Sequence, residues 1–173
     1  VSVPAEQIKT LVQLLATAAG PAGMCGGQAV DLLSVHTKLD LNSLTLMHRM
    51  KTGAMIRASA LMGLYAGNSM PQPQLIGLIA TYATSIGLAF QVIDDILDVT
   101  ADTQVLGKTA GKDAANDKPT YVSLLGVDKA REMAQEQMQQ ALQALHVIES
   151  LPGMSGKTTR LKQIADFIMN RDH

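Results

Sequence analysis

Three aspartates stand close together in the sequence, at Asp94, Asp95 and Asp98. Asp94 and Asp98 are four residues apart, so on a helix they share a face and repel each other. They also end an apolar segment, where the negative end of a helix dipole disfavours negative charge. Mg²⁺ would offset this cost, because it takes oxygen ligands and usually joins one or two carboxylates to substrate phosphates. A solvated helix end is the alternative, and the spacing alone does not decide between them.

The polar segment that follows, residues 101–120, contains Lys108, Lys112, Asp113 and Lys118. Lysines next to a carboxylate metal site are what a diphosphate requires, because the metal neutralises one side of the group and ammonium groups neutralise the other. A flexible charged loop is the alternative, and these residues by themselves favour it.

Two earlier segments contain weaker candidates. Lys51 precedes Gly53, where a small helix surface would let a ligand approach, although a surface lysine is the better interpretation of Lys51 alone. Gln28 and Asp31 are three residues apart and share a helix face after a glycine pair. No strand precedes these glycines and no Lys-Ser/Thr follows them, so a phosphate-binding P-loop is excluded.

The elements that position these residues are all predicted to be helices, because apolar residues recur at helical spacing and no strand-like alternation is found. The expected fold class is therefore all-α, and residues 1–173 are expected to form a single domain. Proline, glycine and capping residues set the expected ends. Helices are predicted at 4–19, at 21–33, from an Asn42 or Ser43 cap to about 66, at 74–99, 121–125 and 127–150, and in a last helix that ends at 170.

The stretch from Gln74 to Ile93 is uncharged over 20 residues, about the length of a transmembrane helix. It contains several polar side chains and leads directly into the aspartates, so the central helix of a bundle is the better interpretation. The sequence therefore predicts that the protein does not span a membrane.

Composition excludes some classes of protein. The formal net charge is −1 and basic residues are scattered, so nucleic acid is not an expected partner. The one cysteine, Cys25, cannot form an internal disulfide, which indicates a reducing, cytoplasmic setting. Cys25 itself is expected to be a small buried residue. The four histidines lack metal-ligand spacing and are given no role.

Taken together, five stretches resemble the trans-prenyltransferase (polyprenyl diphosphate synthase) family, and its bacterial farnesyl diphosphate synthases in particular. They are residues 23–32 (GMCGGQAVDL), 48–59 (HRMKTGAMIRAS), 85–100 (SIGLAFQVIDDILDVT), 106–121 (LGKTAGKDAANDKPTY) and 164–173 (IADFIMNRDH). They follow the family's order and cover nearly the whole chain. The resemblance implies an isoprenoid-synthase-type helical bundle around a central cavity. The family's first aspartate-rich motif has no counterpart here, so the N-terminal helices are expected to be missing and this chain alone to be inactive.

The resemblance also implies Mg²⁺ as cofactor and a role for individual residues. Asp94, Asp95 and Asp98 would bind Mg²⁺, with Asp113 acting through metal-bound water; Lys51 and Lys108 would hold the allylic diphosphate; Thr52 and Gln91 would face the allylic carbon; Gln28 and Asp31 would line the cavity; and Lys118 and Arg171 would be basic positions near its mouth.

The implied reaction condenses dimethylallyl or geranyl diphosphate with isopentenyl diphosphate to give farnesyl diphosphate, in a homodimer. A class I terpene cyclase is one alternative, but Lys51-Thr52 together with Gln91 before the aspartates favours the synthase. A non-catalytic regulatory subunit or fragment of a prenyl synthase is the other. A bare helical scaffold ranks last, because it leaves the three aspartates unexplained.

Overall fold

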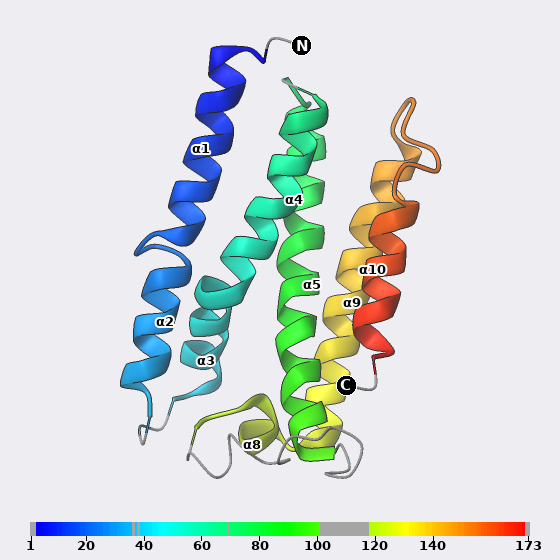
Figure 1. The fold of residues 1–173 in the computed structure, drawn as a ribbon. Coiled ribbons are helices and arrows are strands. Elements are labelled where there is room, and N and C mark those ends of the chain that lie inside the picture. Colours follow the sequence, from blue (N-terminus) through cyan, green and yellow to red (C-terminus); the bar gives the residue numbers. More distant parts are fainter. Residues whose placement is uncertain (1–2, 36, 38, 69, 101–117, 172–173) are drawn as a thin grey trace.

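The computed structural model describes residues 3–35, 37, 39–68, 70–100 and 118–171. Within these residues all regular structure is helical and no strand occurs, so the predicted all-α class is confirmed (Figure 1). In chain order the elements are α1 (Ala5–Ala19), α2 (Met24–Leu33), α3 (Leu41–His48), a π-helical turn η1 (Arg49–Gly53), α4 (Ala54–Gly67), α5 (Pro73–Thr100), α8 (Tyr121–Leu125), α9 (Val127–Ser150) and α10 (Thr159–Met169).

Helix α5 lies at the centre of the bundle and contacts α4, α10 and, most extensively, α9 (Figure 1). By length and composition it could cross a membrane, and 56 % of its most apolar window is buried inside the bundle. Such burial is typical of the core helix of a bundle. The absence of a membrane span stays a prediction.

The core consists of two clusters of buried side chains along α5. The first joins α4, α5, α9 and α10, and includes Leu61, Ile86 and Leu145. The second lies nearer the C-terminal end of α5, where Leu44, Val92 and Tyr121 are fully or almost fully buried. Helix α9 has the predicted bounds, and it buries one face at Ala130, Ala134, Met138, Ala141, Ala144, Leu145 and Ile148.

Two predicted helix starts are wrong. The α3 cap is Asp40, whose carboxylate accepts the Ser43 backbone N–H at 2.7 Å, so neither Asn42 nor Ser43 is the capping residue. Asp, Asn and Ser all suit a cap, but Asp40 comes first in the chain and already accepts a hydrogen bond from a free N–H group of the first turn. Helix α2 begins at Met24 rather than Pro21, because a turn ends α1. Cys25, on its first turn, is exposed, which corrects the expected burial.

The long helix predicted up to residue 66 contains the π-helical turn η1. A π-turn inserts one extra residue into the helix, and such turns occur frequently at functional sites. Here it contains Lys51 and Thr52, two of the predicted site residues.

Candidate active site

Lys51 and Lys118 both contact the carboxylate of Asp31. The Lys51 ammonium lies 2.7 Å from Oδ2 of Asp31, and the Lys118 ammonium lies 3.3 Å from Oδ1 and 3.4 Å from Oδ2. Burial alone raises the pKa of Asp31, but hydrogen bonds and positive charge from the two lysines outweigh it and hold the pKa below its ordinary value. The Asp31 carboxylate is therefore ionised at neutral pH and forms ion pairs with both lysines.

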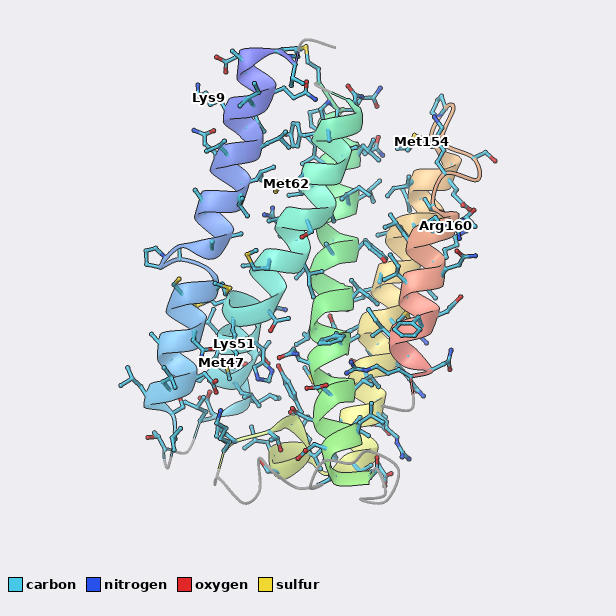
Figure 2. All side chains as sticks on the ribbon, viewed as in Figure 1. Lys9, Met47, Lys51, Met62, Met154 and Arg160 are labelled. Atoms are coloured by element: carbon cyan, nitrogen blue, oxygen red, sulfur yellow. The ribbon has the colours of Figure 1, made fainter. Side chains whose placement is uncertain are left out.

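The close crossing of α2 and η1 brings Asp31 and Lys51 together. A Cβ atom on Gly27 would lie 2.2 Å from the backbone nitrogen of Lys51, so only glycine allows this approach. Asp31 follows Gly27 by one helical turn and so lies on the same face of α2. Figure 2 shows Lys51 near Met47, far along the bundle from Lys9 at the opposite end.

Thr52 contacts Gln91 on α5, where the Thr52 hydroxyl donates a long hydrogen bond of 3.4 Å to Oε1 of Gln91. This contact connects the lysine-bearing turn η1 to the helix that bears the aspartates. The structure thus brings together the two oxygen-bearing side chains that the resemblance places at the allylic carbon.

Arg171 and Asp94 form a third contact, from the end of α10 to α5. Nη2 of Arg171 donates to the Asp94 carboxylate and to the Phe90 carbonyl, both at 3.1 Å. Its guanidinium carbon lies 4.1 Å from the centroid of the Phe90 ring, a cation–π contact. The Arg171 side chain is 10 % exposed, whereas that of Asp94 is 64 % exposed. Arg171 is therefore fixed, and Asp94 keeps an open side.

The other two aspartates of the motif have different surroundings. Asp95 is buried and accepts the Tyr121 backbone N–H at 2.7 Å, at the start of α8. Asp98 is partly exposed and follows Asp94 by one turn of α5. The motif therefore presents Asp94 and Asp98 on one face, as predicted, while Asp95 also holds α8 in place.

The described residues include only some of the predicted Mg²⁺ ligands. Within the described residues, no group of three His, Cys, Asp or Glu side chains is close enough to hold a metal ion. Asp94 and Asp98 nevertheless fit Mg²⁺, which keeps several waters and uses only one or two carboxylates before phosphates complete its shell. Lys108 and Asp113 lie outside the described residues. Gln28 is exposed on α2 and its side chain bonds to none of the described residues.

His48, given no role from the sequence, lies beside the lysines. Its ring meets that of Tyr121 edge to face at 5.3 Å, and its Nδ1 is buried without a hydrogen-bond partner in the described part of the chain. Burial, with charge from Lys51, lowers the pKa of His48 to about 4. Its position three residues before Lys51 is the sequence signal that could have identified it.

A cavity of about 440 Å³ adjoins η1 and lies between this turn and helices α1, α4 and α5. None of the predicted site residues lines it; its wall includes Gln13, Thr17, Arg49, Gly53, Arg57 and Thr84. The candidate site is therefore an open end of the bundle and not this cavity.

Comparison with known proteins identifies the family of this chain. The family model described as Polyprenyl synthetase matches residues 3–151. The chain belongs to the polyprenyl synthetase family. A farnesyl diphosphate synthase of Haemophilus influenzae is 41 % identical to this chain over 170 residues. The matched region covers 98 % of this chain and 55 % of the relative. A farnesyl diphosphate synthase of Escherichia coli is 42 % identical over 163 residues, 94 % of this chain and 53 % of the relative.

Solved structures share the fold. A geranyltransferase of Helicobacter pylori was solved in complex with magnesium and isoprenyl diphosphate. It matches 97 % of this chain and 52 % of its own length, with a TM-score of 0.77 and 33 % identity. A geranylgeranyl pyrophosphate synthetase of Pyrococcus horikoshii matches 98 % of this chain and 61 % of its own length, with a TM-score of 0.83 and 26 % identity. The chain spans about half the length of the curated relatives it matches.

Proposed function

We propose that the protein containing this chain is a Mg²⁺-dependent prenyltransferase that condenses an allylic diphosphate with isopentenyl diphosphate to give farnesyl diphosphate. One observation carries the proposal: Lys51 and Lys118 meet at one end of the bundle, and the Thr52–Gln91 contact connects them to the helix that bears Asp94. Relatives and a structural neighbour whose names specify farnesyl diphosphate synthase, magnesium and isoprenyl diphosphate support it.

Each residue has a task in this reaction. Lys51 and Lys118 bind the diphosphate and stabilise the charge that develops as it leaves. The oxygens of Thr52 and Gln91 face the allylic carbon, where positive charge grows. Asp94 and Asp98 would hold Mg²⁺, which would supply positive charge to stabilise the leaving diphosphate. The uncharged stretch of α5 before the aspartates would wall the space for the growing chain and keep water from the cation.

Three further parts of the proposal follow from the family and from composition. The protein acts in the cytoplasm, as its single cysteine indicates, and α5 is a core helix and not a membrane span. It works as a homodimer. A terpene cyclase is less favoured, since a cyclase need not hold a second diphosphate.

The experiment that tests this proposal compares thermal stability with and without Mg²⁺ plus a non-hydrolysable allylic diphosphate analogue. A ligand that binds only the folded state raises the melting temperature. We expect a Mg²⁺-dependent rise of a few degrees in the unmodified chain, on the scale of about 1–2 kcal/mol of stabilisation. Asp94→Ala should abolish it.

Asp128→Ala is the matched control, because Asp128 is an exposed aspartate in the first turn of α9 and is not one of the candidate-site residues. It should leave the rise unchanged. An equal rise in Asp94→Ala, or none in the unmodified chain, would contradict the diphosphate site; with no rise at all, the non-catalytic alternative is favoured.

A further inference from the structure

We propose that Asp31 is a positioning residue, which holds Lys51 and Lys118 side by side so that they bind one diphosphate group together. This inference rests on the proposed function and deepens it, because the resemblance gives Asp31 only as part of the cavity wall. Here Asp31 acts on the substrate through the lysines and does not touch it.

The first support is the geometry of the three side chains. Both ammonium nitrogens lie within 3.4 Å of the same carboxylate. The Asp31 side chain is 11 % exposed, whereas those of Lys51 and Lys118 are 34 % and 29 % exposed. The carboxylate is therefore the most buried of the three groups, and the lysines lie between it and water. Each ammonium has three N–H donors, so its contact with Asp31 leaves at least one donor for a phosphate on the open side.

The second support is the origin of the three side chains, which come from separate parts of the chain. Asp31 is on α2, Lys51 is in the π-helical turn, and Lys118 precedes α8. Among the described residues, no other carboxylate contacts either lysine. Without Asp31 the lysines would have no common partner, and each would turn toward water.

Two effects oppose each other when the carboxylate is removed. The local positive charge increases by one, which favours an anion, but two long side chains regain rotamer freedom that binding must then remove. Water screens charges that are about one-third exposed. We therefore expect the loss of positioning to dominate, so that neutralising Asp31 weakens anion binding.

The test measures the affinity of the chain for inorganic diphosphate with Mg²⁺ by titration calorimetry. Asp31→Asn should weaken binding about fivefold or more, against the direction that charge alone predicts. Asp31→Glu keeps the charge and moves the carboxylate by one methylene, so it too should weaken binding. Asp166→Asn removes an exposed aspartate of α10 and should change nothing.

A double-mutant cycle identifies the pair. Lys118→Met should weaken binding in the unmodified chain and have much less effect in Asp31→Asn, because Lys118 is no longer positioned there. Equal effects in both backgrounds would refute the positioning role. So would unchanged or tighter binding by Asp31→Asn and Asp31→Glu. In either case, a loss of diphosphate binding in Lys51→Met would still support the proposed diphosphate site, and only the positioning role of Asp31 would fail. If Lys51→Met has no effect on binding, both proposals fail.

Discussion

At the residue scale, the pKa of His48 in the candidate site is strongly lowered. Its imidazole lies against Tyr121, and the positive charges of Lys51 and Lys118 oppose its protonation while Asp31 favours it. Burial is the largest cause, and the pKa falls from 6.5 to about 4. His48 is therefore neutral in the folded protein at neutral pH, and it adds no charge beside the lysines.

The stability of the chain should consequently fall as the pH drops from 7.5 to 5. Between pH 6.5 and pH 4 the unfolded chain binds a proton at His48 that the folded chain does not, so acid favours unfolding. We expect a loss on the order of 2 kcal/mol, measured by urea unfolding at both pH values. Asp31 and Glu149, whose pKa values are lowered, lose their contribution only below about pH 4, near the ordinary pKa of a carboxyl.

His48→Gln should remove most of this pH dependence, since glutamine does not titrate. His146→Gln is the control, because His146 is exposed on α9. A His48 resonance that titrates by NMR at its ordinary value near 6.5 would show that the imidazole is not held neutral by the fold.

At the scale of the element, the crossing of α2 over η1 sets the position of the lysine. Gly27→Ala should therefore destabilise the fold by about 3 kcal/mol or more, because the added methyl group meets backbone atoms that cannot move aside. Chemical denaturation measures the loss. Gly63→Ala is the control: a Cβ there meets nothing within 4 Å, and alanine should stabilise α4 by about 0.5–1 kcal/mol. Equal effects of the two substitutions would mean that the close crossing is not needed.

One hydrogen bond between α10 and the central helix α5 lies near the start of α10. The Tyr82 hydroxyl, on α5, donates to the Leu161 carbonyl at 2.8 Å. Tyr82→Phe should cost about 1 kcal/mol, since the acceptor is left without its partner in a partly buried place. Tyr65→Phe, at a tyrosine whose hydroxyl bonds to no described residue, should cost almost nothing. Thermal unfolding distinguishes the two, and equal midpoints would contradict a specific role for the bond.

At the scale of the whole molecule, α1 has an exposed apolar stripe. Ile8, Val12 and Leu15 are 49 %, 60 % and 45 % exposed and recur at helical spacing. Exposed apolar stripes of this kind mark surfaces that associate. The proposed homodimer would cover the stripe with a second copy of the chain.

Val12→Glu should therefore shift the chain toward monomer, with at least about a tenfold weaker association constant, because a charge would be buried at the contact. Sedimentation equilibrium over a range of concentrations measures this. Met70→Glu changes a more exposed methionine in the α4–α5 connection and should have no effect on assembly. If both variants associate like the unmodified chain, the stripe is not the contact surface.

The sequence by itself determined the helices, because periodicity and end signals act locally. Helices α8 and α9 begin and end where the sequence predicted them, at 121–125 and 127–150. It also determined the family, because five short stretches in order are specific. The roles of Thr52, Gln91, Asp94 and the remaining site residues stay predictions, and Lys108 and Asp113 lie outside the described residues.

Only the tertiary structure decided which of these residues meet. Lys118 meets Asp31 from 87 residues away, and Arg171 meets Asp94 from 77 residues away. The π-helical turn and the neutral His48 also depend on which elements pack together. The physical reason is that side chains from separate helices meet only where the backbones cross closely. One such crossing, at Gly27, is set by the absence of a side chain on one residue.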